Sequence, residues 1–160
     1  LLAERLEVLH LDADDFYWVP SDPPFRTKRR PEARVELVLE RIAAHDSWVL
    51  SGSICSWGDP LLERFTLAVF LHLNPQLRLE RLREREAGRY GARIQPGGDM
   101  HRQHQDFMEW AQSYDHGKAP LRSLDLHESW MKRLGCPVIR LDAEVPAARL
   151  AEEVMDRAAA

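Results

Sequence analysis

An apolar segment near the middle of the chain constrains the fold most strongly. Residues 66–73 read TLAVFLHL, with an apolar side chain at nearly every position. A strand with one face in water alternates apolar and polar residues, so a continuous apolar run predicts a strand buried on both faces. Strands of this kind occur in parallel sheets covered by helices, because the crossover between two parallel strands needs a helix.

Other strands and helices alternate along the chain as this architecture requires. Strands are predicted at residues 8–11, 48–53 and 138–141. Residues 1–6 resemble the end of an amphipathic helix, and further helices are predicted to begin at Pro31, at Pro75, after Asp99, at about Pro120 and at Pro146. We therefore predict an α/β fold with a parallel sheet flanked by helices, as one domain over residues 1–160. Glycines predict a loop at about 88–98.

The composition does not favour several classes of binding partner. The net charge is -4, which favours neither a nucleic-acid partner nor an anionic membrane surface. No apolar run approaches the roughly 20 residues of a membrane span. The two cysteines, Cys55 and Cys136, fit no zinc or redox spacing, so we expect reduced thiols and a cytoplasmic protein. Because the chain opens inside a helix-like segment without a methionine, residues upstream of Leu1 are expected.

Three carboxylates follow the first predicted strand. Asp12, Asp14 and Asp15 stand where ligands bind in open α/β sheets, beyond the carboxyl ends of the strands. Their mutual repulsion would be relieved by Mg²⁺ or by hydroxyl groups of a substrate. The alternative is a solvated turn in which one carboxylate caps the next segment.

A second group follows the strand at 48–53. Gly52 permits a ligand to approach the backbone closely, and Ser53 comes directly after it. Trp57 could stack on a ring of the ligand, and Asp59 could accept hydrogen bonds from it. The alternative is that Gly52 only turns the chain and that Trp57 is a core residue.

Arginines form the third group. Arg85 and Arg89 share a helix face, and Arg93 lies in the glycine-rich loop, which could close over a substrate as a lid. Arginine binds phosphate through paired hydrogen bonds, so these three are candidate phosphate contacts. The alternative is a solvated helix face paired with nearby glutamates. Arg29, in the basic segment 26–30, is a further candidate, with a solvated loop as its alternative.

The order of these motifs resembles that of P-loop kinases related to adenylate kinase and shikimate kinase. The similarity rests on the strand ending in His10-Leu11-Asp12-Ala13-Asp14-Asp15, the strand ending in Ser51-Gly52-Ser53, and Asn74-Pro75 before an arginine-rich helix. Asp14-Asp15-Phe16-Tyr17-Trp18 and Trp57-Gly58-Asp59-Pro60 look more closely like a bacterial group labelled adenylate kinase or AAA-family ATPase. The family hallmark G-x-x-x-x-G-K-[ST] is absent from these 160 residues, so the first strand and phosphate loop are expected just before Leu1.

The resemblance implies ATP-dependent phosphoryl transfer with Mg²⁺ to a nucleoside, a nucleoside monophosphate or a small hydroxylated metabolite. Asp14 would orient the acceptor or act as base, Asp12 would hold the metal, and the loop at 88–98 would be the lid. The remaining implied roles are charge neutralisation by Arg85, Arg89 and Arg93, substrate binding by Asp12, Asp15, Arg29, Gly52, Ser53, Trp57 and Asp59, and adenine binding by Arg140 and Asp142. The alternatives are a nucleotide-binding regulatory protein without turnover and an interaction module.

Overall fold

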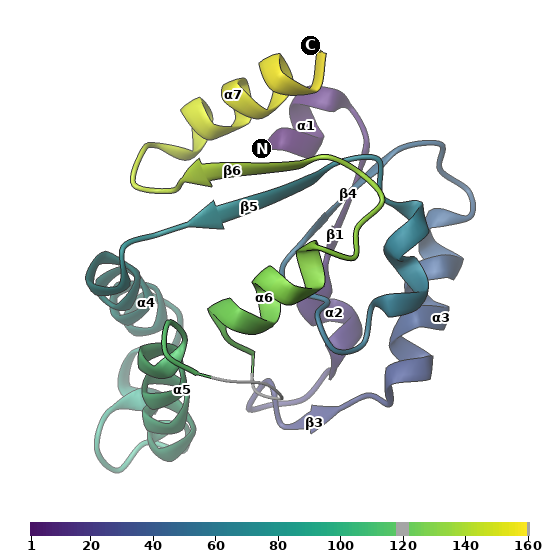
Figure 1. Cartoon of the computed structure of the whole chain (residues 1–160). Helices are drawn as coiled ribbons and strands as arrows, with labels where there is room; N and C mark the ends of the chain where they lie inside the picture. The colour runs from purple at the N-terminus through teal and green to yellow at the C-terminus, as the bar shows by residue number, and fades with distance from the viewer. Residues whose placement is uncertain (118–121, 160) are drawn as a thin grey trace.

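The computed structural model describes residues 1–117 and 122–159 as strands and helices that alternate along the chain (Figure 1). This confirms the α/β class. The strands are β1 (Leu9–Asp12), β2 (Trp18–Val19), β3 (Thr27–Lys28), β4 (Trp48–Ser51), β5 (Ala68–His72) and β6 (Val138–Asp142). The helices are α1 (Leu2–Leu6), α2 (Ala13–Tyr17), α3 (Pro31–Ile42), η1 (Asp59–Arg64), α4 (Pro75–Tyr90), η2 (Gly91–Ile94), α5 (His101–Ser113), α6 (Leu124–Met131) and α7 (Ala147–Ala159). None of the described helices is both long and apolar enough to cross a membrane.

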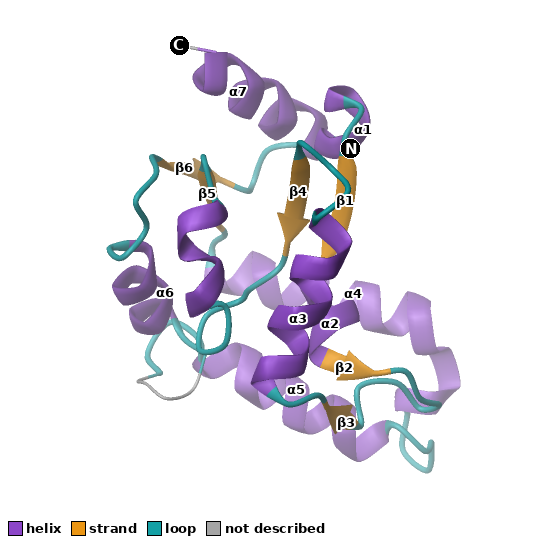
Figure 2. Cartoon of the chain, turned by 90° about the vertical axis from the view of Figure 1, so that its right-hand side faces the viewer, coloured by secondary structure: helices purple, strands orange, loops and turns teal. Residues whose placement is uncertain are grey.

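The parallel strands form two separate pairs. β1 pairs with β4, with Leu9 opposite Trp48, and β5 pairs with β6, with Ala68 opposite Val138. β2 and β3 form a short antiparallel ribbon. Figure 2 shows the two parallel pairs side by side, in the order β6, β5, β4, β1. The prediction of parallel strands is confirmed for both pairs, while among the described residues no ladder joins β4 to β5.

The main core lies around β1 and β4. Val38 of α3 and Leu61 of η1 are 0% and 1% exposed, and Trp130 of α6 closes the same cluster. The apolar stripe predicted for α3 is confirmed, since Val35, Val38 and Ile42 are all buried. A smaller cluster packs α7 against β6 through Val154 and Leu141.

β5 departs from the expectation that both of its faces are buried. Its first residues are partly buried, but Leu71 is 52% exposed. Leu71 and His72 lie at the carboxyl end of the strand, where they line an open pocket rather than packing under a helix. The apolar run therefore marks a strand correctly, while its carboxyl end faces a cavity.

Several predicted boundaries are corrected. α4 continues through Gly88 to Tyr90, and η2 follows it, so the predicted lid loop at 88–98 is largely helical. α5 begins after Met100 rather than after Asp99, whose carboxylate instead accepts hydrogen bonds from Arg93. α6 begins after Ser123, whose hydroxyl accepts the N–H of Leu126. The predicted start of that helix at Pro120 lies outside the described residues.

Candidate functional site

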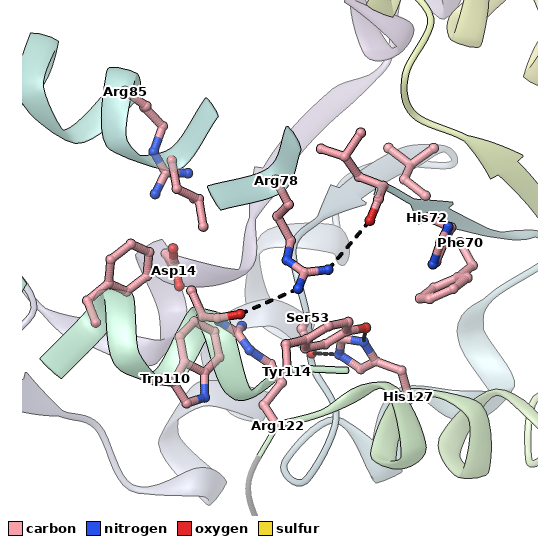
Figure 3. Close-up of a pocket in the computed structure, with 15 residues that line it drawn as sticks. Asp14, Ser53, Phe70, His72, Arg78, Arg85, Trp110, Tyr114, Arg122 and His127 are labelled. Atoms are coloured by element: carbon pink, nitrogen blue, oxygen red, sulfur yellow. Dashed lines mark hydrogen bonds between the residues drawn. The ribbon is translucent and has the colours of Figure 1, made fainter. Parts of the chain in front are cut away.

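A pocket of about 310 Å³ opens at the carboxyl ends of β1, β4 and β5, and we call it the strand-end pocket. Asp14 follows β1, Ser53 follows β4, and Leu71 and His72 end β5, with Leu73 directly after it. Helices α4, α5 and α6 supply the remaining walls (Figure 3). The complete lining is Asp14, Ser53, Phe70, Leu71, His72, Leu73, Arg78, Leu82, Arg85, Phe107, Trp110, Ala111, Tyr114, Arg122 and His127.

Asp14 is the carboxylate of this pocket. The side chain of Asp12 caps α2 by accepting the N–H of Asp14 at 3.0 Å, and this fixes the first turn that carries Asp14. Asp14 keeps contact with solvent, yet the protein atoms around its carboxylate displace water and raise its pKa. Repulsion from Asp12 raises this pKa further, while Arg122, the Trp18 N–H and Arg85 oppose the shift. A carboxylate with a raised pKa is better suited to accept a proton than an ordinary aspartate.

Three arginines line the strand-end pocket, with different partners. Arg78 forms an ion pair with Asp115 and also donates to the carbonyls of Leu73 and Ala111. Arg85 pairs with its neighbour Glu86 at 3.0 Å.

Arg122 lies with its guanidinium 4.5 Å from the ring centre of Trp110, and no carboxylate among the described residues pairs with it. Figure 3 shows Asp14 between the side chains of Arg85 and Arg122. Arg122 is thus the cation of the pocket that is best placed to receive an anionic ligand.

The Arg78–Asp115 pair makes a testable contribution to stability. Hydrogen bonds from Arg78 lower the pKa of Asp115, so the pair stabilises the folded state above the ordinary aspartate pKa and loses this effect as the pH falls through the lowered value. We expect Asp115→Asn to lower the free energy of unfolding at neutral pH and to have no effect once the pH lies below the lowered pKa of Asp115. Urea denaturation at both pH values measures this. Asp106→Asn, in the exposed Arg102–Asp106 pair, is the control, and an equal loss at both pH values would contradict the interpretation.

A row of three hydrogen-bonded side chains forms another wall of the strand-end pocket. Ser53 Oγ lies 2.9 Å from His127 Nε2, and the Tyr114 hydroxyl lies 2.6 Å from His127 Nδ1. Burial and the charge of Arg122 lower the pKa of His127 to about 4, so the imidazole is neutral at physiological pH. This row therefore presents a hydroxyl group, without added charge, opposite Asp14.

The structure brings three of the predicted residues, Asp14, Ser53 and Arg85, into the strand-end pocket. Gly52 and Asp12 lie directly beside it. Gly52 has φ +93°, and a Cβ atom there would lie 2.9 Å from the Cβ of Ala13, so glycine allows β4 to pass close to α2. The strand-end argument thus selected residues that the structure brings together at one end of the strands.

The other predicted residues lie outside this pocket. Asp15 and Arg29 line a smaller cavity beside α3, where Arg29 donates to the carbonyls of Asp15, Phe16 and Trp18. Arg89 does not line the pocket, and Arg93 pairs with Asp22 and Asp99.

Four more of the predicted residues have structural contacts. Trp57 is 4% exposed in the core, as its alternative interpretation holds. Asp59 accepts hydrogen bonds from Trp130 and Arg133. Arg140 pairs with Glu128, and Asp142 accepts the N–H of Glu144.

Three residues of the lining match no sequence motif. They are Arg78 of α4, Arg122 of the segment before α6, and His127 of α6. Trp110 and Tyr114 stand with Phe107 at helical spacing, a pattern typical of a core or of a pocket wall. The one usable signal was the helix amphipathicity that orients Phe107, Ala111 and Tyr114 in one direction.

A metal would need the substrate to complete its coordination. Within residues 1–117 and 122–159, no three His, Cys, Asp or Glu side chains gather as metal ligands. Mg²⁺ is commonly held by one or two carboxylates together with water and substrate phosphates. Asp12 and Asp14 satisfy this smaller requirement, and their mutual repulsion favours a cation. The motif G-x-x-x-x-G-K-[ST], which holds the phosphates of ATP in P-loop proteins, does not occur in these 160 residues.

Comparison with known proteins places the chain in a family. No protein-family model matches the chain, and no solved structure matches it. It is 39% identical over 155 residues to the uncharacterized protein YqaC of Bacillus subtilis (strain 168), and this alignment covers 97% of the chain and 85% of YqaC. Identity at this level over almost the whole chain shows that the protein belongs to the same family as YqaC.

Proposed function

We propose that the strand-end pocket binds an anionic, hydroxylated small molecule and that the protein transfers a phosphoryl group to it from ATP. The observation that carries the proposal is the position of Asp14 beside Arg85 and Arg122, at the carboxyl ends of neighbouring strands. A carboxylate with a raised pKa can take the hydroxyl proton, and the arginines can bind the anionic part of the same molecule.

In the proposed reaction, the acceptor hydroxyl oxygen bonds to the γ-phosphorus, the bond from that phosphorus to the β–γ bridging oxygen breaks, and ADP leaves. The proton of the hydroxyl goes to the Asp14 carboxylate. ATP supplies the phosphoryl group, and Mg²⁺ held by Asp12 would supply charge neutralisation. The aromatic side chains of Phe70, Phe107 and Trp110 exclude water from the pocket walls, which strengthens the interaction between arginine and anion.

The open edges of the strands support a P-loop NTPase architecture for this proposal. Among the described strands, β4 pairs only with β1, and β5 pairs only with β6, so each has one edge without a strand neighbour. These two edges belong to the inner strands in the order β6, β5, β4, β1 (Figure 2). An unpaired strand edge is a template for another strand. In a P-loop NTPase architecture, a further strand followed by the phosphate-binding loop would pair with these two edges.

The test uses the full-length protein with Mg-ATP and a panel of nucleosides, nucleoside monophosphates and hydroxylated carboxylates. We expect ADP release that depends on one acceptor class. Arg122→Ala should raise the KM for that acceptor about tenfold or more, the effect of losing one charge-assisted hydrogen bond, with a smaller effect on kcat.

Arg102→Ala, on the exposed surface of α5, is the matched control and should leave both constants unchanged. Tight binding of nucleotide without acceptor-dependent ADP release would contradict the proposal and favour a regulatory nucleotide-binding protein.

A further inference from the structure

The row Tyr114–His127–Ser53 connects three elements that are far apart in the sequence. Tyr114 directly follows α5, His127 lies in the middle of α6, and Ser53 follows β4. All three side chains line the strand-end pocket, and Figure 3 shows the imidazole of His127 between the serine and the tyrosine. Both imidazole nitrogens are therefore engaged by hydroxyl groups, at 2.9 and 2.6 Å.

The number of donors and acceptors on each side chain decides which atom donates in each hydrogen bond of this row. A neutral imidazole has one N–H donor and one acceptor nitrogen, and a phenol has a single proton to donate. His127 Nδ1 is the acceptor that the described residues offer to the Tyr114 hydroxyl, and a half-buried phenol proton without an acceptor is costly. Tyr114 therefore donates to Nδ1. The imidazole proton then lies on Nε2 and is donated to Ser53 Oγ.

The charged groups around the row keep both rings in these protonation states. Desolvation raises the pKa of Tyr114 to about 12, so the phenol retains its proton. Around His127, burial and Arg122 lower the pKa, and Glu128 opposes them only in part because it is paired with Arg140. Phe70, on β5, faces the imidazole edge-on with 6.1 Å between ring centres and adds no charge.

We propose that Tyr114 and His127 hold the Ser53 hydroxyl as a hydrogen-bond donor into the strand-end pocket, so that this wall selects an oxygen acceptor on the ligand. Because Ser53 Oγ receives the Nε2 proton, its own O–H is directed to another acceptor. The sulfur of Cys55 is one such partner, but sulfur is a weak acceptor that a ligand oxygen outcompetes. A phosphate, carboxylate or carbonyl oxygen accepts the Ser53 O–H, whereas an ammonium or amide N–H would use only the remaining lone pair of Ser53 Oγ and leave the O–H without a strong acceptor.

The inference rests on the pocket as the ligand site and does not need the phosphoryl-transfer step. In this arrangement His127 and Tyr114 are positioning residues, since they act through Ser53. Ser53 is the group that contacts the ligand. A protein without ATP turnover would therefore not contradict this inference. Its own test must detect the hydrogen bonds of His127 and Ser53 directly.

Nitrogen NMR of full-length protein with labelled histidine measures the protonation state and tautomer of His127 without a ligand. We expect His127 to show the neutral form protonated at Nε2 at neutral pH and to remain mostly neutral at about pH 5, which is above the lowered pKa. In Tyr114→Phe the Nδ1 acceptor loses its donor, and we expect a mixture of the two neutral tautomers. A wild-type His127 protonated at Nδ1, or charged at neutral pH, would overturn the inference.

Titration with inorganic phosphate tests whether the Ser53 hydroxyl donates a hydrogen bond to an oxygen of the ligand. Removing a hydrogen bond to a charged ligand costs about tenfold in affinity, so Ser53→Ala should weaken phosphate binding by about that factor. Ser53→Thr retains the hydroxyl and should bind phosphate nearly as well as the wild type. Tyr114→Phe should fall between them. Equal phosphate affinity in Ser53→Ala and the wild type, or no phosphate binding by the folded wild type, would overturn the selection of an oxygen acceptor.

Discussion

Asp14→Asn is expected to lower kcat about 100-fold or more, the usual contribution of a general base, and at the same time to raise the melting temperature. The two effects have one cause. Desolvation and repulsion from Asp12 disfavour the charged form of Asp14 in the folded protein and so raise its pKa. Asparagine cannot accept the proton, but it also carries no charge to be disfavoured.

The sign of the stability effect follows from the raised pKa. Above the folded pKa the ionised carboxylate is less favourable in the folded than in the unfolded chain, so ionised Asp14 reduces stability. Below the ordinary aspartate pKa of about 3.9 both states are protonated and this penalty vanishes. Asp14→Asn should therefore stabilise the protein at neutral pH and lose this advantage in acid. Calorimetry at the two pH values, beside steady-state kinetics, measures both effects.

Asp15→Asn is the matched control for this pair of effects. Asp15 follows Asp14 directly, yet it lines the smaller cavity beside α3 rather than the strand-end pocket. The control should leave kcat unchanged. A loss in Asp15→Asn as large as that in Asp14→Asn would assign the effect to the acidic turn as a whole, and unchanged kcat in Asp14→Asn would remove the proposed base.

Gly52→Ala has the second large expected effect, because it disturbs the turn that holds Asp12 and Asp14. Gly52 has φ +93°, and the added Cβ would meet the Cβ of Ala13 at 2.9 Å, closer than such atoms approach. We expect a loss of about 1–3 kcal/mol in the free energy of unfolding, together with reduced turnover as α2 shifts. Urea denaturation and kinetics measure the two consequences.

Gly88→Ala is the matched control for the glycine substitution. Gly88 lies within α4, and no atom stands within 4 Å of the position that its Cβ would occupy. Alanine should stabilise this helix by about 0.5–1 kcal/mol. If both substitutions destabilised the protein alike, close contact between β4 and α2 would not be the reason for glycine at position 52.

Sequence patterns predicted the elements of this fold better than their ends. The apolar periodicity located α3, and the apolar run at 66–73 located β5, because both signals come from residues close together in the chain. The predicted loop at 88–98 failed for a local reason. A single glycine in a helix costs about 1 kcal/mol, and the flanking residues of α4, including the buried Glu86, hold the helix past Gly88 to Tyr90.

The site was predictable where a general rule connects sequence to position. Strand ends of a parallel sheet meet at one edge, and this rule brought Asp14 and Ser53 to the same pocket. No such rule exists for Arg122 and His127, which reach the pocket through α6 and the segment before it. Their positions depend on how α6 packs through Trp130 against the β1–β4 core, which is tertiary information. The contacts of Arg93 and Asp59 with distant partners, Asp22 and Trp130, depend on tertiary packing in the same way.

Phosphorus NMR of the full-length protein incubated with Mg-ATP and its best acceptor tests the central claim most directly, because it identifies where the phosphoryl group goes. The proposal predicts a new phosphorus resonance on the acceptor that grows in step with ADP, and its near absence in Asp14→Asn. Growth of inorganic phosphate alone, or an unchanged ATP spectrum with the acceptor bound, would contradict the assignment of the strand-end pocket to phosphoryl transfer.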